Sequence, residues 1–197
     1  DLGPGGLNGT LDSEGLGTSN PGSMTFAGTA GADNVGFGDH TQWDGLNKIS
    51  VAIWFRVGDS LGSHGSHGTI FSKDNIIECW FKFNSTVPGM SINNNHIQPA
   101  TSTLTINTMY HGVWVADISG TDTRSFYLNG VLDGSSTSGT QSSGTLNNTA
   151  QAFHIGGRPS NYDFKGQVYH VAVYTGKVLT AAEVSQNFNA QRSRFGI

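Results

Sequence analysis

Residues 50–62 read SVAIWFRVGDSLG, and this stretch distinguishes between two fold classes. An apolar strand that runs into a serine flanked by glycines is typical of hydrolases with a nucleophile elbow, and GDSLG also contains the GDSL esterase signature. An elbow needs a helix after the serine, whereas GSHGSHGTIFS at residues 62–72 is a Gly-rich loop followed by another strand. None of the seven His has an Asp three positions before it, as the GDSL class requires. We therefore predict that Ser60 is a loop residue and not a nucleophile.

The chain from Met24 onward is predicted to be all-β. Short runs rich in β-branched and aromatic residues recur between Gly, Asn, Asp and Pro, as in antiparallel sandwiches. These runs are MTFAG, NVGFG, ISVAIWFRV, GTIFS, IIECWFKF, MSIN, STLTIN, GVWVADIS, RSFYLNGVL, QAFHIGG and KGQVYHVAVYTG. The fold class that they indicate is a two-sheet antiparallel β-sandwich.

Two local signals refine this prediction. Asn129-Gly130 is a dipeptide that favours a two-residue turn with positive φ, so a tight hairpin is expected there. Residues 179–191, LTAAEVSQNFNAQ, predict one short C-terminal helix, with Thr180 as N-cap and Glu183 completing a capping box.

Composition limits the partners of the chain. Its 197 residues suit one domain, and only 12% of them are charged, about half of the usual share. A net charge of -4 argues against nucleic acid and anionic membranes as partners. The apolar stretches are strand-sized and shorter than the roughly 20 residues of a transmembrane helix, so no membrane insertion is expected.

Residues 1–23 are predicted to be an extended N-terminal arm, and residues 24–197 the folded domain. The arm holds seven Gly and too few apolar side chains to offset the entropy of ordering it. We expect it to pair with the sheet edge of a neighbouring subunit. The residues assigned to this assembly arm are Asp1, Leu2, Leu7, Leu11 and Leu16.

Two tryptophans are candidates for stacking against sugar rings. Trp54 and Trp80 have the strand parity opposite to the strongest aliphatic rows, so both are expected to point away from the inter-sheet core. Arg56 accompanies Trp54 on its strand. These three residues form the candidate carbohydrate site. The alternative is that a covering loop or a subunit contact buries the tryptophans.

Other reactive groups point to structural roles. Cys79 shares a strand face with apolar residues and is expected to be buried. His64 and His67 have no nearby third ligand, which favours a solvated loop over a metal site. The three N-x-[ST] sequons, at Asn8, Asn84 and Asn147, are about as many as chance predicts in a chain this rich in Asn, Ser and Thr.

Glycoside hydrolysis requires two carboxyl groups that flank the scissile bond. The chain has only three Glu, at positions 14, 78 and 183, and contains no E-x-D-x-E motif. A pair built from Asp39, Asp44 and Asp163 on separate loops stays open, although nothing favours it over Asp in turns. No enzymatic activity is expected.

The sequence resembles the laminin G-like, concanavalin A-type jelly rolls. The matching segments run from MTFAGTAGADNVGFG through ISVAIWFRV, GTIFSKDN and RSFYLNGVLDG to HIGGRPSNYDFKGQVYHVAVYTGKVLTAAEVSQNFNAQRSRFGI. The closing NFNAQRSRFGI is similar to the ends of lectin-like domains in virion proteins of tailed phages. This resemblance implies a two-sheet jelly roll and, in some members, glycan binding or calcium.

Calcium is the one cofactor that the resemblance suggests, and none is otherwise expected. Members that bind it commonly carry an acidic residue in the penultimate strand, whereas this chain has Tyr169 and His170 in GQVYHV. Calcium prefers oxygen ligands. If an ion binds, Asp33, Asp39 and carbonyls near Gly36 are the expected ligands.

The function expected from these features is that of a non-enzymatic structural subunit in an extracellular or virion assembly, such as a phage capsid decoration, tail or fibre-type protein. Its partners would be copies of itself or other structural subunits, with cell-surface glycans as a second class. The alternative is a secreted or surface lectin or adhesin. A glycoside hydrolase is the least favoured reading.

Overall fold

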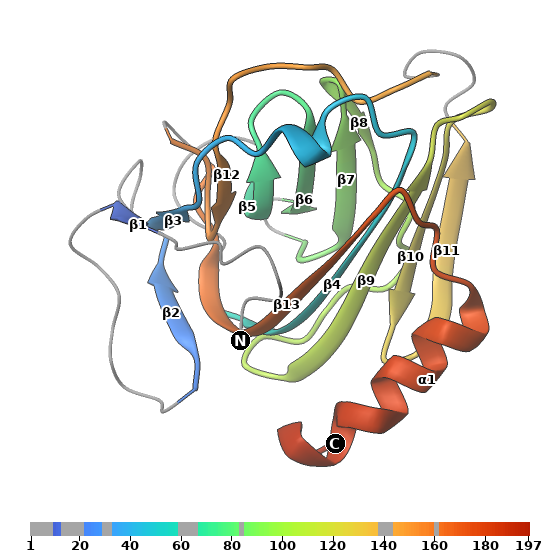
Figure 1. Cartoon of the computed structure of the whole chain (residues 1–197). Coiled ribbons are helices and arrows are strands. Elements are labelled where there is room, and N and C mark those ends of the chain that lie inside the picture. The colour runs from blue at the N-terminus through green and yellow to red at the C-terminus, as the bar shows by residue number, and fades with distance from the viewer. Residues whose placement is uncertain are drawn as a thin grey trace.

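Two antiparallel sheets face each other in the computed structural model (Figure 1), which describes residues 10–12, 22–28, 33–58, 67–82, 85–137, 144–159 and 162–197. The seven-stranded sheet has the order β1-β3-β12-β5-β6-β7-β8. Its strands are β1 (Thr10–Asp12), β3 (Asn34–Gly36), β5 (His67–Lys73), β6 (Ile77–Lys82), β7 (Pro88–Ile92), β8 (Asn95–Ile97) and β12 (Phe153–Ile155). The order β11-β10-β9-β4-β13-β2 makes the six-stranded sheet. Its strands are β2 (Met24–Ala27), β4 (Lys48–Val57), β9 (Met109–Asp117), β10 (Thr123–Leu128), β11 (Val131–Thr137) and β13 (Lys165–Thr175).

The core lies between the two sheets and is built from alternate residues of each strand. Val51, Ile53 and Phe55 of β4 belong to it, as do Cys79 and Phe81 of β6. Cys79 is buried, as predicted, and burial raises the pKa of its thiol well above the ordinary value. The all-β sandwich predicted from the sequence is therefore confirmed.

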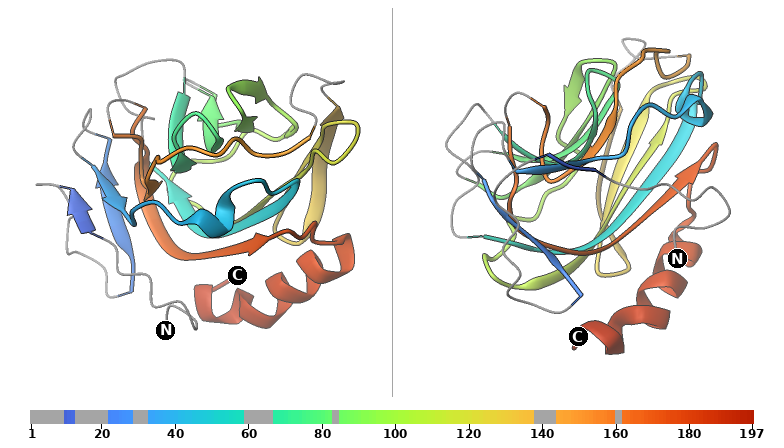
Figure 2. Two further views of the ribbon diagram at one scale, coloured as in Figure 1. Left: turned by 45° about the horizontal axis from the view of Figure 1, so that its top comes forward. Right: turned by 60° about the vertical axis from the view of Figure 1, so that its left-hand side comes forward.

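The helical segments differ in position, since one of them contributes Trp43 to the core between the sheets and the others lie at the C-terminus. A 3-10 turn, η2 (Thr41–Trp43), follows β3, and the chain ends with α1 (Ala181–Gln191) and η3 (Arg192–Phe195). Figure 2 shows α1 on the side of the six-stranded sheet that faces away from the other sheet. Thr180 and Glu183 form the predicted capping box at its start. A second apolar cluster, which includes Ala52, Val113 and Val184, fills the space between this helix and the sheet.

The predicted hairpin is also confirmed. β10 pairs with β11 across Asn129 and Gly130, which have φ values of 49° and 85°. Both angles lie in the left-handed region that a two-residue hairpin turn of this type requires.

The predicted strand at STLTIN, residues 102–107, is wrong. The described segment forms no strand, and side chains satisfy part of its backbone. The Thr86 hydroxyl donates to the Leu104 carbonyl at 2.6 Å, and the Thr105 N–H donates to the Tyr110 hydroxyl at 3.0 Å. Leu104 is buried while Ile106 is 44% exposed, so the alternating pattern marks an anchored loop.

Part of the predicted arm forms a strand in this chain's own sheet. Thr10–Asp12 pairs with Asn34–Gly36 and makes β1 the edge strand. Of the assigned arm residues, only Leu11 falls within a described segment, and Asp1, Leu2, Leu7 and Leu16 lie outside the described residues. Pairing of the arm with a neighbouring subunit stays a proposal.

Among the described residues, no helix has the length and apolar character needed to cross a membrane.

Candidate functional site

Trp54 and Trp80 both point away from the inter-sheet core, as their strand parity predicts. Neither belongs to the central core cluster. They lie on different sheets, Trp54 on β4 and Trp80 on β6, so they face opposite sides of the sandwich. The two indoles therefore do not form a joint platform for a sugar ring.

The C-terminal segment covers Trp54 completely. The indole is 0% exposed and stacks on Phe195, with ring centroids 4.2 Å apart, and on Phe188 at 5.8 Å. On β9, His111 lies 4.8 Å from the same indole. In this arrangement the Trp54 indole has no surface exposed for stacking against a sugar ring.

Trp80 borders an open hollow of about 300 Å³ on the outer face of the seven-stranded sheet. We call it the Trp80 hollow. Its lining residues are His67, Trp80, Lys82, His96, Gln98, Arg158 and Tyr162. Such a mixture of aromatic rings and hydrogen-bonding groups is typical of small-ligand sites.

A hydrogen-bond chain fixes the wall of the Trp80 hollow. The Trp80 indole N–H donates to the Ser91 hydroxyl at 3.0 Å, and this hydroxyl contacts His96 Nδ1 at 2.5 Å. The Ser91 oxygen accepts from the indole, and the tautomer of His96 determines whether the hydroxyl donates to Nδ1 or accepts from it. Partial burial lowers the pKa of His96 below its ordinary value. The neutral imidazole thus offers Nε2 as a hydrogen-bonding atom at the hollow.

The Trp80 indole packs directly on the backbone of Gly89, which has no side chain. Trp80 and Gly89 are paired across β6 and β7, and a Cβ added to Gly89 would approach the indole to 2.2 Å. The glycine therefore allows the ring to lie close to the sheet.

Ion pairs hold the opposite wall. Glu78, which is 1% exposed, contacts Arg158 at 3.0 Å and His67 at 3.3 Å. Arg158 also forms an ion pair with Asp74. The charge of Arg158 is thereby balanced by two carboxylates, and the hollow is polar without a strong excess of either charge.

Tyr162 completes the aromatic wall in an unusual backbone conformation. Its ring stacks on His67, with centroids 4.4 Å apart and planes within 5°, and the Arg158 guanidinium lies 5.1 Å from its centroid. The φ of Tyr162 is 68°, a value that aromatic residues rarely adopt. Strained residues of this kind are found preferentially at binding sites.

Sequence reasoning found Trp80 but missed most of its neighbours. His67, which had been assigned to a solvated loop, is the first residue of β5 and 6% exposed. Arg158 and Tyr162 come from GRPSNYDF, a Gly- and Pro-containing connection between β12 and β13. A charged and an aromatic side chain among turn residues were the sequence feature that could have indicated a site here.

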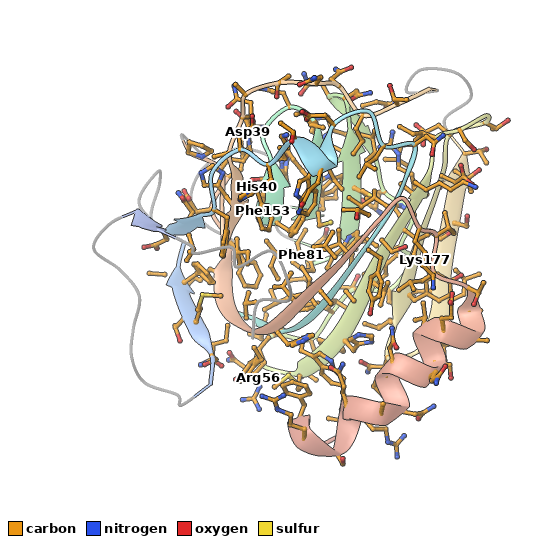
Figure 3. All side chains as sticks on the ribbon, in the orientation of Figure 1. Asp39, His40, Arg56, Phe81, Phe153 and Lys177 are labelled. Carbon is orange, nitrogen blue, oxygen red and sulfur yellow. The ribbon has the colours of Figure 1, made fainter. Side chains whose placement is uncertain are left out.

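Arg56, the third predicted sugar-binding residue, lies on β4 beside the covered face. Its guanidinium is 5.8 Å from the Tyr169 ring, and it lines a different hollow from Trp80. Figure 3 shows Arg56 at the end of the molecule opposite to Asp39 and His40. The structure therefore keeps Trp54 and Arg56 on one face of β4 and separates both from Trp80.

The residues suggested for calcium are arranged differently from an ion cage. Lys73 Nζ donates to Asp39 and to Asp44 at 2.9 Å each, so an ammonium group already faces Asp39. Burial alone would lower the pKa of Lys73, but these two hydrogen bonds outweigh it and raise the pKa above the ordinary value. Asp33 is 3% exposed and Gly36 ends β3. Within the described ranges, no group of three or more His, Cys, Asp or Glu could hold a metal.

The remaining candidates are placed as follows. Ser60, His64, Asn8 and Asn84 lie outside the described residues, and Asn147 is exposed.

The family model of the concanavalin A-like lectin/glucanases superfamily matches residues 28–185. The chain therefore belongs to this superfamily, as its resemblance to laminin G-like jelly rolls implied. A search of curated proteins found no match.

Solved structures share the fold at low sequence identity. Domain 4 of AbnA, a GH43 extracellular arabinanase from Geobacillus stearothermophilus, in complex with arabinotriose, is 20% identical, with a TM-score of 0.62 over 89% of this chain and 83% of that one. The binding domain of Paraclostridial Mosquitocidal Protein 1 is 14% identical, with a TM-score of 0.70 over 96% and 49%. The ligand-binding domain of botulinum neurotoxin serotype D, in complex with N-acetylneuraminic acid, is 14% identical, with a TM-score of 0.66 over 94% and 47%. The chain spans about half the length of these two toxin domains.

Proposed function

We propose that this chain is a non-catalytic carbohydrate-binding module that binds a neutral saccharide in the Trp80 hollow. The observation that carries the proposal is the preorganised wall of this hollow. The bonds of Ser91 and Glu78 hold Trp80, His96 and Arg158 in place before any ligand arrives. Rigid donors beside aromatic carbon suit a saccharide, which has hydroxyl groups and apolar C–H faces.

The charge balance of the hollow supports a neutral rather than an acidic sugar. Arg158 is ion-paired with Asp74 and Glu78, which weakens its attraction for a carboxylate of the ligand, and Lys82 is the other cation in the described lining. Two of the structural neighbours were solved with saccharides, arabinotriose and N-acetylneuraminic acid. They support saccharides as the ligand class without identifying the sugar. The extracellular arabinanase also supports an extracellular location for this chain.

The absence of catalysis is part of the proposal and is supported by the state of the nearby carboxylates. Glycoside hydrolysis needs two carboxyl groups that can reach the scissile bond. Glu78 is 1% exposed and ion-paired, and Asp74 is paired with the same arginine. Neither is placed to protonate a leaving group, so we expect no hydrolysis of arabinan or other glycans.

A glycan array tests the proposal with three variants. Each of His96→Ala and Gln98→Ala removes one exposed side chain from the hollow, and Gln151→Ala is a matched control at an exposed glutamine elsewhere. The loss of one hydrogen bond, worth about 1 kcal/mol, should weaken binding about fivefold in either hollow variant. The control should bind as the parent does. Absence of saccharide binding by the parent, or unchanged binding by both hollow variants, would contradict the proposal.

A structural role in an extracellular or virion assembly is the second candidate. The observation that favours it is β1, a short strand from the Gly-rich N-terminal region that adds to the sheet edge at β3. The same backbone pairing could be made to a neighbouring copy, as in strand exchange between subunits. The neighbours named above are not virion proteins. Native mass measurement tests this role, because an assembly subunit forms large particles that a chain lacking residues 1–23 does not form.

A further inference from the structure

A second hollow, of about 330 Å³, opens at the end of the six-stranded sheet. We call it the Arg56 hollow. Its lining residues are Thr25, Phe26, Arg56, Gly58, Asn107, Lys165, Gly166 and Gln167. Among the described residues of this lining, the charged side chains are Arg56 and Lys165. This is notable in a chain whose net charge is -4.

Strand pairing brings the polar side chains of the Arg56 hollow into one row. Gln167 of β13 is the register partner of Thr25 on β2 and of Arg56 on β4. Register partners on adjacent strands point to the same face, and so does Lys165, two residues before Gln167. Asn107 joins them because its N–H donates to the Val57 carbonyl at 2.7 Å. The sheet itself therefore fixes the spacing of these groups.

Neighbouring contacts orient the donors of the row. The Tyr169 hydroxyl donates to the Gln167 amide oxygen at 2.8 Å, which leaves the Gln167 NH₂ group as a donor. The Arg56 guanidinium is placed over the Tyr169 ring, at 5.8 Å from its centroid. Such stacking holds a guanidinium without neutralising its charge.

Arg56 differs from Arg158 in its ion pairing. Arg158 contacts two carboxylates, whereas no ion pair joins Arg56 to any carboxylate of the described residues. Arg56 Nε and the Thr25 hydroxyl are buried and have no hydrogen-bond partner among the described residues, and the same is true of Arg158 Nε. A buried polar group without a partner costs about 1–3 kcal/mol, so this corner of the fold gains from an added acceptor.

We propose that the Arg56 hollow binds an oxyanion, the sulfate ester or carboxylate of an acidic saccharide. An oxyanion supplies acceptor oxygens to Arg56, Lys165 and the amides, and a guanidinium binds planar or tetrahedral oxyanions through two parallel N–H bonds. The proposal rests on the proposed function only in naming a saccharide as the carrier of the anion. Under this proposal the Trp80 hollow binds a neutral sugar and the Arg56 hollow binds an anionic group.

Titration of the whole chain with four probes tests the oxyanion site. The probes are inorganic sulfate, galactose 6-sulfate, glucuronic acid and neutral galactose, each followed by amide chemical shifts at constant ionic strength. We expect saturable shifts at Arg56, Lys165 and Gln167 with sulfate and with at least one acidic sugar. Galactose should leave these residues unshifted. The two acidic sugars separate a sulfate ester from a carboxylate as the preferred anion.

Variants assign the binding to this hollow. Arg56→Gln and Lys165→Gln each keep a polar side chain and remove a cation, and each should weaken sulfate binding at least about tenfold. Lys48→Gln is the matched control on the same sheet and should leave it unchanged, since Lys48 is paired with Asp117. Linear shifts without saturation, or tight sulfate binding by both hollow variants, would overturn the proposal.

Saccharide binding in the Trp80 hollow can be tested independently of the oxyanion site. Gln98→Ala should leave sulfate binding intact, and Arg56→Gln should leave neutral-glycan binding intact. If sulfate binds and no neutral saccharide does, the Arg56 proposal stands while the proposed function fails.

Discussion

Trp54 and Trp80 occupy equivalent positions on the outer faces of the two sheets, yet one is sealed and the other borders a hollow. α1 and η3 cover Trp54, which is 0% exposed, whereas Trp80 is 7% exposed and borders an open hollow. The same strand parity thus produces an additional apolar layer on one face and a candidate binding face on the other. The comparison shows that strand parity places a tryptophan on an outer face, and that the segments packed on this face determine whether it borders an open hollow.

Replacing Trp54 should produce the largest loss of stability. Trp54→Ala leaves a cavity beneath Phe188 and Phe195, and removal of a buried aromatic side chain costs about 3–5 kcal/mol. Denaturant unfolding measures the change. Asn189→Ala, on the exposed face of the same helix, should change the free energy of unfolding by less than about 0.5 kcal/mol. A small loss in Trp54→Ala would mean that the helix does not seal this face.

Acidification should produce the second-largest loss of stability, on the face that α1 covers. Burial, with a smaller contribution from His170, lowers the pKa of His111 from 6.5 to about 4. The folded protein therefore keeps His111 neutral where the unfolded chain protonates it. Its stability is fully present above pH 6.5 and falls as the pH drops toward 4, by about 3 kcal/mol.

The contribution of His111 is measured by unfolding the parent and His111→Gln at pH values between 7 and 4. The glutamine cannot titrate, so the difference in unfolding free energy between the two proteins should shrink by about 3 kcal/mol over this range. Parallel pH profiles would contradict the assignment to His111.

On the open face, Gly89→Ala should displace Trp80. The added Cβ would lie 2.2 Å from the indole in its present position, and such overpacking costs about 1–3 kcal/mol. Saccharide binding should weaken together with the stability. Gly120→Ala is the control, because no heavy atom lies within 4 Å of its added Cβ. Unchanged binding by Gly89→Ala would show that the position of Trp80 is irrelevant to the ligand.

The helix cap should have the smallest effect of the four. Thr180→Ala removes the side-chain acceptor for the Glu183 N–H, and the loss of such a cap costs about 1 kcal/mol. Because α1 covers Trp54, the variant should also increase the access of acrylamide to tryptophan fluorescence. Ser185→Ala, within the helix, is the matched control and should be neutral or slightly stabilising. Equal stability of both variants would contradict the role of the capping box.

The parts of the fold that depend on local chemistry could be predicted from the sequence. The Asn129-Gly130 hairpin and the Thr180 cap are set by residues within a few positions, and both are confirmed. The strand predicted at residues 102–107 failed because the hydroxyls of Thr86 and Tyr110 satisfy its backbone. No pattern within that segment could reveal these partners.

The candidate site was predictable only in part for the same reason. Strand parity placed Trp54 and Trp80 on outer faces, but parity does not say where the C-terminal helix will pack. The Trp80 hollow joins His67 of β5 to Arg158 and Tyr162 of a distant connection, through contacts with Glu78. Only the pairing of β5, β6 and β12 brings these segments together.

The most direct test of the account follows the four tryptophan indole N–H signals in a ¹H–¹⁵N spectrum while a saccharide selected on the array is added. Trp80 is the only tryptophan in the lining of the hollow, and Trp54 serves as an internal control on the opposite face. The account predicts a saturable shift of the Trp80 signal and an unchanged Trp54 signal. A shift of Trp54 without a shift of Trp80 would contradict it and would place the ligand on the face that the helix covers.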